Sequence, residues 1–283
     1  MRRHLSLLIL ALFLLAALFS CQRGAITVEK GKICVYFLDV GEGDCILIRT
    51  ADTAILVDTG EADEDVTDTV LSTLRRQGVT RLDCLVLTHP HTDHIGGASA
   101  VLEALEVDEC LMPYAVAEGE VFSRLLDTLE RGDTRLLEAY ADRTLTYGDL
   151  TLEILSPERR GYGDLNDHSI VLRVVFQETA ILLTGDATAL AEAEILGRYP
   201  REALSADLLK VGHHGAETSL SEAFLSAVAP THAVISCGAG NAYGHPHAAT
   251  LLRLRNAGVT VWRTDKQGDI IFLGDGAEFS RIK

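Results

Sequence analysis

The chain has 283 residues and carries 25 basic against 41 acidic side chains, which gives a formal charge of −16 at pH 7. Such an acidic chain repels nucleic acid and anionic lipid at long range, so a polyanionic substrate would need a locally positive site. Apart from Cys21, the five cysteines are odd in number and lack CxxC spacing, which argues against a disulfide framework and against a cysteine zinc cluster.

The N-terminus, MRRHLSLLILALFLLAALFSC, has two arginines and then a continuous apolar run over residues 5–19. This run is shorter than the span of about 20 residues that crosses a membrane, and it is typical of a signal peptide. It ends in LFSC, which resembles the lipobox of bacterial lipoproteins. We therefore predict a signal peptide at 1–20, then a lipidated Cys21 with a short tether at 21–32. The protein would be extracytoplasmic and lipid-anchored to a bacterial membrane; an uncleaved anchor is the alternative.

Three short apolar segments with glycine-containing turns follow, and they predict strands at 33–39, 45–49 and 54–58. The amphipathic stretch VTDTVLSTLRRQG predicts a helix that ends at Gly78. Residues 82–88 are continuously apolar, as in a strand that is buried on both faces of a sheet. The segment GGASAVLEALEV, at 96–107, then predicts a helix that packs back on this strand.

The second half of the chain has the same rhythm, after a predicted hairpin at 144–155. Its predicted strands lie at 170–176, 180–186, 207–212, 232–238, 259–264 and 269–273, and its predicted helices at 189–199, 220–228 and 250–258. Two similar halves of apolar strands and helices predict one α/β (α+β) domain over residues 33–283. Its architecture would be a four-layer αββα sandwich, in which helices cover two mixed sheets packed face to face.

The stretch THPHTDHIGG places three histidines and an aspartate on one turn after the strand at 82–88. Pro90 keeps the backbone between His89 and His91 extended, so both imidazoles can converge on one metal ion. Asp93 and His94 follow at the start of the next helix and would serve a second position. Two ions bound in this way lie about 3.5–4 Å apart, the separation that activates a water molecule and stabilises a leaving oxygen.

Further ligands should come from the ends of other apolar strands. LLTGD supplies Asp186, which could bridge both ions, and LKVGHHG supplies His213 and His214. His213, at the strand end, is the favoured ligand, and His214 would support a ligand or contact the substrate. NDHS offers His168 or Asn166 as a further contributor.

Four other positions are candidates for supporting roles. Asp58, in LVDTG, could hold a ligand histidine by its second nitrogen. His245, in NAYGHPH, is a candidate for contact with an oxyanion or phosphate, with a loop-ordering role as the alternative. Lys210 and Arg263 would either supply local positive charge or be solvated surface residues.

Seven segments carry a resemblance to a known family: FLDVGEGDCILI, LVDTG, THPHTDHIGG, NDHSIVLRVVF, LLTGD, LLKVGHHGAETS and NAYGHP. From about Ile33 to Phe272 the chain resembles the metallo-β-lactamase superfamily, and more narrowly the hydrolase domain of ComEC-type competence proteins, which serve in DNA uptake. The resemblance implies the αββα sandwich and a hydrolase with two divalent ions, Zn²⁺ or Mn²⁺. It also carries metal binding onto the turn and onto two strand ends: His89, His91, Asp93, His94, Asp186 and one of His213 and His214.

The chain departs from the family pattern at three positions. Glu42 stands where these proteins usually have glutamine, and it adds negative charge near the site. Ala216 replaces a usual serine and removes a possible donor to the substrate. His168 falls at a position that varies in the family. We expect a stand-alone, lipid-tethered form of the hydrolase module.

These expectations lead to a metal-dependent hydrolase that cleaves a phosphodiester with a metal-bridged hydroxide. Asp93 would orient the hydroxide or pass a proton to the leaving group. The substrate would be DNA or an envelope or lipid headgroup, and no protein partner is implied. One alternative is a hydrolase of lactams, lactones or other carboxyl esters. The other is an inactive lipoprotein that binds DNA or an envelope polymer.

Overall fold

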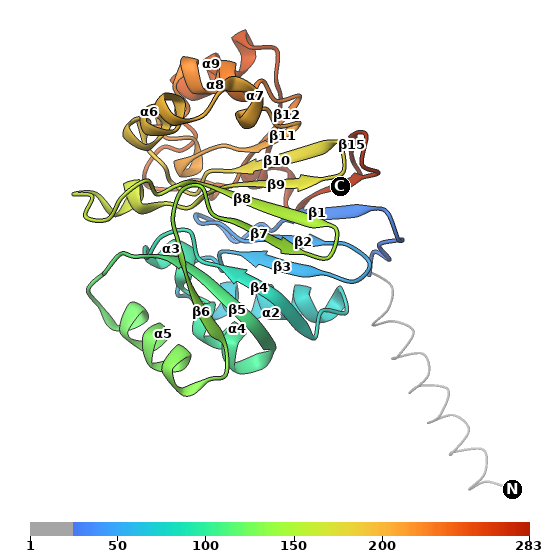
Figure 1. Cartoon of the computed structure of the whole chain (residues 1–283), viewed down its shortest axis with the longest axis vertical. Coiled ribbons are helices and arrows are strands. Elements are labelled where there is room, and N and C mark those ends of the chain that lie inside the picture. Colours follow the sequence, from blue (N-terminus) through green and yellow to red (C-terminus); the bar gives the residue numbers. More distant parts are fainter. Residues whose placement is uncertain (1–24) are drawn as a thin grey trace, which may run out of the picture.

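The structure is a computed structural model that describes residues 25–283. Two β-sheets lie face to face in the middle of the molecule, and helices cover the outer side of each sheet (Figure 1). The predicted αββα sandwich of two mixed sheets is therefore confirmed. The predicted signal peptide and Cys21 lie outside the described residues and stay predictions.

The first sheet has eight strands in the order β15-β14-β1-β2-β3-β4-β5-β6. The pairs from β15 to β3 are antiparallel, and the pairs from β3 to β6 are parallel. Its strands are β1 (Ile33–Phe37), β2 (Ile46–Arg49), β3 (Ala54–Val57), β4 (Arg81–Val86), β5 (Glu106–Pro113), β6 (Arg135–Ala139), β14 (Ile270–Gly274) and β15 (Phe279–Arg281). The helices of this half are α2 (Glu64–Arg76), α3 (Thr92–Ile95), α4 (Ala98–Ala104) and α5 (Glu120–Arg131).

The second sheet has seven strands in the order β13-β12-β11-β10-β9-β8-β7. Here β7 to β10 are antiparallel and β10 to β13 are parallel. Its strands are β7 (Thr144–Tyr147), β8 (Leu150–Ser156), β9 (Val171–Phe176), β10 (Thr179–Leu183), β11 (Leu208–Lys210), β12 (His232–Ile235) and β13 (Thr260–Arg263). The helices of this half are α6 (Ala189–Arg198), α7 (Arg201–Leu204), α8 (Glu222–Val228), α9 (Ala248–Asn256) and α10 (Thr264–Gln267), with 3-10 turns η1 (Leu165–His168) and η2 (His213–Gly215).

Both faces of the central strands are buried. In β1, Val35 and Phe37 pack between the two sheets, while Cys34 and Tyr36 pack under the helices of the first layer. A strand that is buried on both faces needs apolar residues at successive positions, which explains the continuous apolar runs of the sequence. The five cysteines of the described part are buried and unpaired, so they act as small apolar residues.

Three segments differ from or add to the sequence prediction. The helix predicted over 96–107 ends at Ala104, because Leu105 is extended and β5 begins directly after it. Residues 108–143, for which we predicted no elements, contain most of β5, α5 and β6. Within the predicted tether, Val28 is buried and the Ile26 N–H donates to the Gln77 side chain, so part of this segment packs on the domain. Among residues 25–283, no helix has the length and apolar character to span a membrane.

Candidate metal centre

Four side chains from both layers meet where the strands of the two sheets end. Asp93, His94, Asp186 and His214 each offer one nitrogen or oxygen atom, and these atoms lie within 4.8 Å of one another. We call these four residues the central cluster. The His214 Nε2 atom is 3.2 Å from Asp93 Oδ2 and 3.4 Å from Asp186 Oδ2, and His94 Nε2 is 3.4 Å from Asp186 Oδ1. The turn after β4 thus faces the ends of β10 and β11.

The atoms of the central cluster fit a divalent cation. His94 Nε2 and Asp186 Oδ1 are buried and have no hydrogen-bond partner among the described residues. Buried polar atoms are nearly always paired, so two orphaned atoms that face each other call for a ligand. Imidazole nitrogen and carboxylate oxygen are common protein ligands of zinc and of other divalent metals. The protein therefore has a plausible metal site at this position.

The electrostatics of the cluster also favour a cation. Burial would lower the pKa of His214, but the carboxylates of Asp186, Asp93 and Asp44 together outweigh it and raise this pKa to about 10. Burial would likewise raise the pKa of Asp186, yet His214 and His94 hold it well below its ordinary value. The carboxylates therefore draw positive charge into a buried site. A metal ion would take the place of protons on the imidazoles, since ligand histidines must be deprotonated.

Two acceptors orient the histidines of the cluster. Asp58, which is fully buried, accepts from the Thr88 N–H at 2.8 Å and from the Thr88 hydroxyl at 2.7 Å, and its Oδ2 lies 2.8 Å from His94 Nδ1. The carbonyl of Ser236 lies 3.0 Å from His214 Nδ1. In both rings Nδ1 is the natural donor, which leaves the Nε2 lone pair directed at the cluster, the state that a metal ligand requires.

The remaining histidines of the turn lie beside this cluster. His89 Nε2 is 2.9 Å from His91 Nδ1, and the ring centroids of His89 and His94 are 4.1 Å apart. Burial, with His94 as the next contributor, lowers the pKa of His89 well below its ordinary value, so this ring is neutral. The structure therefore brings all four predicted residues of THPHTDHIGG together.

The structure brings His214, rather than the favoured His213, into the cluster. Both residues have left-handed backbone, with φ of 49° and 51°, in the tight turn η2. This turn buries the His214 side chain and leaves that of His213 26% exposed, with its Nε2 3.8 Å from Asp186 Oδ2. His213 lies at the edge of the cluster, where it faces the pocket.

The predicted contributors of NDHS lie apart from the central cluster. The His168 ring packs edge-on against Tyr162, at 5.1 Å between centroids, and neither His168 nor Asn166 is among the residues that line the pocket. Asn166 lies in η1 and is 9% exposed. Only Leu165 of this turn reaches the pocket wall.

A pocket of about 410 Å³ opens over the cluster. Its lining comes from both layers and consists of Glu42, Pro90, His91, Thr92, Asp93, Ala117, Glu118, Leu165, Asp186, His213, His214, Tyr243 and His245. His245, a predicted substrate contact, is therefore in the pocket wall. Its Nδ1 lies 2.6 Å from Glu42 Oε1, a contact that the sequence did not predict.

Neither of the two predicted positive residues lines this pocket. Lys210 is fully buried, with its Nζ 2.7 Å from Asp44 Oδ2, so its interpretation as a surface residue is wrong. Its partner lies in the loop between β1 and β2, far away in the sequence. Arg263 donates to both carboxylate oxygens of Asp265, at 2.8 and 2.6 Å. Lysine and arginine side chains therefore contribute no positive charge to the wall of this pocket.

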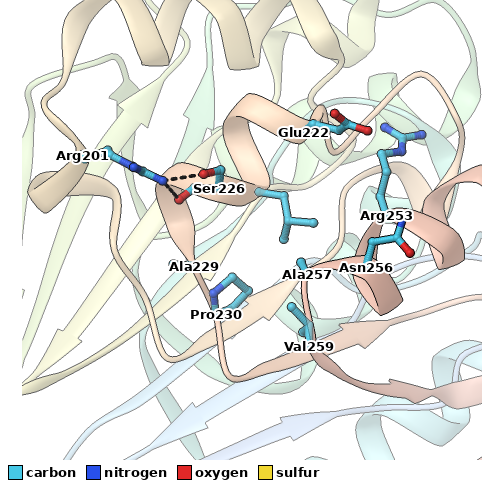
Figure 2. Close-up of a pocket in the computed structure, with 10 residues that line it drawn as sticks. Arg201, Glu222, Ser226, Ala229, Pro230, Arg253, Asn256, Ala257 and Val259 are labelled. Carbon is cyan, nitrogen blue, oxygen red and sulfur yellow. Dashed lines mark hydrogen bonds between the residues drawn. The ribbon is translucent and has the colours of Figure 1, made fainter.

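A larger pocket, of about 590 Å³, lies between α7, α8 and α9 (Figure 2). Arg201 donates to Ser226 at one side, and Arg253 donates to the carbonyls of Ser219 and Leu220. Both arginines of this pocket therefore donate hydrogen bonds to groups of the protein itself. The described residues form no metal-ligating cluster in this pocket. The pocket over the central cluster is therefore the better candidate site.

An αββα sandwich with histidines and aspartates gathered where its strands end is an architecture suited to binding metal ions. A family model described as "Metallo-beta-lactamase superfamily" matches residues 38–239, and the chain belongs to this superfamily. The resemblance predicted from the sequence is confirmed, and membership supports a hydrolase.

Individual proteins that are similar to this chain agree with its membership of the superfamily. The chain is 36% identical over 267 residues to "Competence protein ComA" of Neisseria gonorrhoeae, covering 94% of this chain and 36% of that protein. It is 30% identical to "ComE operon protein 3" of Bacillus subtilis (strain 168), covering 83% and 32%. The chain thus spans about a third of the length of these relatives. Among solved structures, the metallo-beta-lactamase fold protein YhfI from Bacillus subtilis has a similar fold, with a TM-score of 0.57, 14% identity, and coverage of 86% of this chain and all of that one.

Proposed function

We propose that the protein is a divalent-metal hydrolase that cleaves phosphodiester bonds, in DNA or in an envelope or lipid headgroup. The central cluster carries this proposal, because its orphaned His94 and Asp186 atoms meet under a pocket that is open to substrate. Membership of the superfamily supports hydrolysis, and the names of the relatives, which refer to competence and, for a third one, to recombination, support our choice of a phosphodiester.

The residues would divide the work as follows. Asp93, His94, Asp186 and His214 would hold divalent cations together with the neighbouring His89 and His91. Bound cations of this kind, two of them in our proposal, supply Lewis-acid activation of water and stabilise the charge of the leaving oxygen. Asp93 is a quarter exposed and lines the pocket, so it could also orient the attacking water or carry its proton.

The charge of the pocket supports a role for cations in substrate binding. Its lining includes four carboxylates, Glu42, Asp93, Glu118 and Asp186, but no lysine or arginine. An anionic phosphodiester would be repelled from such a wall. Bound cations would reverse this local charge, so substrate binding and chemistry would depend on the same ions.

Hydrolysis assays with two substrate classes test the proposed bond specificity. With added Mn²⁺ or Zn²⁺, we expect turnover of bis-p-nitrophenyl phosphate and little turnover of nitrocefin. Asp186→Asn keeps the shape of the side chain but removes its charge, and it should abolish the turnover. Hydrolysis of nitrocefin with an inert phosphodiester would instead assign a carboxyl-type hydrolase. Inactivity towards both, in a protein that binds no metal, would indicate a binding lipoprotein.

We also propose that Cys21 anchors the protein to a membrane by lipid, on the extracytoplasmic side. The apolar run and the LFSC sequence support this proposal. Incorporation of a labelled fatty acid by the wild type, and its loss in Cys21→Ala, would support the anchor. Labelling that is equal in both proteins would contradict it.

A further inference from the structure

Glu42 makes two short contacts in the wall of the candidate pocket. Its Oε2 accepts a hydrogen bond from the backbone N–H of Gly238 at 2.7 Å, and its Oε1 lies 2.6 Å from His245 Nδ1. Glu42 comes from the loop between β1 and β2, and its two partners come from the chain that follows β12. A Cβ atom on Gly238 would lie 2.9 Å from the Glu42 backbone nitrogen, so the two segments are closely packed.

His245 is held in one orientation. The Asn241 side chain donates to the carbonyl of His245 at 2.8 Å and accepts from its N–H at 2.9 Å. The Tyr243 ring stacks on the imidazole, with centroids 5.5 Å apart and an interplanar angle of 16°. Within residues 25–283 no hydrogen bond to His245 Nε2 is found, and His245 lines the pocket. Nε2 is therefore the ring nitrogen that a ligand can reach.

The count of donors and acceptors places a hydrogen on His245 Nδ1. Both oxygens of a carboxylate only accept, so with Gly238 on one oxygen, the other needs the hydrogen of His245 Nδ1. A glutamine of the same shape has one oxygen and one NH₂ group. The Gly238 N–H would take that oxygen, and the NH₂ group would then face Nδ1 and require its lone pair. The ring hydrogen would have to move to Nε2.

We propose that Glu42 holds His245 in the Nδ1-protonated tautomer, so that the Nε2 lone pair accepts a hydrogen bond from an O–H donor in the pocket, either water or a substrate hydroxyl. Glu42 is then a positioning residue, and Glu42→Gln should change the ligand-facing nitrogen from an acceptor to a donor. The tautomer itself follows from the contacts alone. The role of the O–H donor in a reaction rests on the proposed function.

Nitrogen NMR of the histidine side chains tests the tautomer directly. In the full chain labelled with ¹⁵N-histidine and loaded with diamagnetic Zn²⁺, long-range ¹H–¹⁵N correlations identify the hydrogen-bearing nitrogen of each neutral ring. His245→Gln assigns the signal. We expect the Nδ1–H pattern in the wild type and the Nε2–H pattern in Glu42→Gln. Glu118→Gln, which removes another carboxylate from the pocket wall, should leave the wild-type pattern unchanged.

A wild-type His245 that carries its hydrogen on Nε2, or the same tautomer in wild type and Glu42→Gln, would overturn the inference. Kinetics then distinguish the two O–H donors. If the donor is water, Glu42→Gln should lower kcat for bis-p-nitrophenyl phosphate about 3- to 10-fold, the worth of one hydrogen bond, at unchanged KM. If the donor is a substrate hydroxyl, KM should rise only for hydroxyl-bearing phosphodiesters. Failure of the proposed function would appear separately, as no hydrolysis by the wild type.

Discussion

Asp58 decides which nitrogen of His94 faces the central cluster. It lies in a left-handed backbone conformation, with φ of 58°, and receives its hydrogen bonds from one neighbouring strand end and from α3. The two carboxylate oxygens together accept from the Thr88 N–H, the Thr88 hydroxyl and the His94 ring. These contacts fix the carboxylate, and the fixed carboxylate orients the imidazole. A buried acceptor behind a ligand histidine both orients the ring and strengthens it as a ligand.

Replacing Asp58 by asparagine should weaken metal binding without unfolding the protein. Asparagine tolerates the left-handed backbone, but its NH₂ group would face a donor instead of accepting from it. We expect the affinity for Zn²⁺ or Mn²⁺ to fall about 10- to 100-fold, measured by competition with a chromophoric chelator. The exposed Asp52→Asn is the control and should bind like the wild type. Equal affinity in Asp58→Asn would contradict the role.

The sequence predicted contacts between residues that are close along the chain better than contacts between residues that only the fold brings together. The spacing of THPHTDHIGG was enough to predict the turn, because its members need only one local bend to converge. The choice between His213 and His214 depends on two left-handed residues in η2, which no spacing pattern reveals. The pairs of Glu42 with His245 and of Asp44 with Lys210 join distant segments, so the sequence did not show that these residues are partners.

The loop between β1 and β2 ties the two layers together beneath the site. Besides the ion pair of Asp44 with Lys210 of β11, the backbone N–H of Asp44 donates to the carbonyl of Asp93 at 3.2 Å. The same loop therefore positions Asp93 in the first layer and binds Lys210 of β11 in the second layer. These two contacts help to hold α3, which carries Asp93, close to the segment that carries His214.

Lys210→Met should be strongly destabilising. Methionine retains most of the length of the lysine side chain but leaves the buried Asp44 carboxylate without its cation. The loss of this partner lowers the free energy of unfolding by about 3–5 kcal/mol. Urea denaturation should show this loss in the free energy of unfolding, and adding Asp44→Asn should recover part of it. The exposed Lys266→Met serves as the control. A loss no larger than that of the control would show that the buried pair does not hold the layers.

Gly96 allows α3 to approach the loop after β3. A Cβ atom at this position would lie 2.1 Å from the Ala62 backbone nitrogen, too close for any side chain. Gly96→Ala should therefore displace α3 with Asp93 and His94, lowering both the melting temperature and the metal affinity. Gly197→Ala, in α6 with nothing within 4 Å of its new Cβ, should be neutral or stabilising by about 1 kcal/mol. Similar melting temperatures in the two variants would contradict this packing.

Strands with an unbroken apolar run were predicted, whereas β5 and β6, in which charged residues interrupt the run, were not. The central strands β1 and β10 are buried at every position, and both were predicted from their apolar runs. By contrast, β5 begins with EVDE, where charged residues interrupt the run, and the preceding helix pattern was extended into it. Strand β6 lies at the sheet edge with exposed positions, so burial imposes little pattern on it.

The net charge of the whole chain should control its association with long substrates. At −16, and −18 if cleavage removes two arginines with residues 1–20, the protein repels a polyanion at a distance even when cations make the pocket attractive. Added salt screens this repulsion. For an oligonucleotide, kcat/KM should therefore rise about twofold or more between low and physiological ionic strength, whereas bis-p-nitrophenyl phosphate should respond weakly. A steep fall with salt would instead indicate a positive binding face.

The proposed hydrolysis depends on cations held between the two layers by Asp93, His94, Asp186 and His214. The most direct measurement is a crystal structure of the protein with Mn²⁺, with anomalous difference density used to place the metal. We predict at least one strong peak within bonding distance of both Asp186 and His214. A fully resolved cluster with no anomalous density, in crystals where Mn²⁺ is bound elsewhere or not at all, would contradict this prediction.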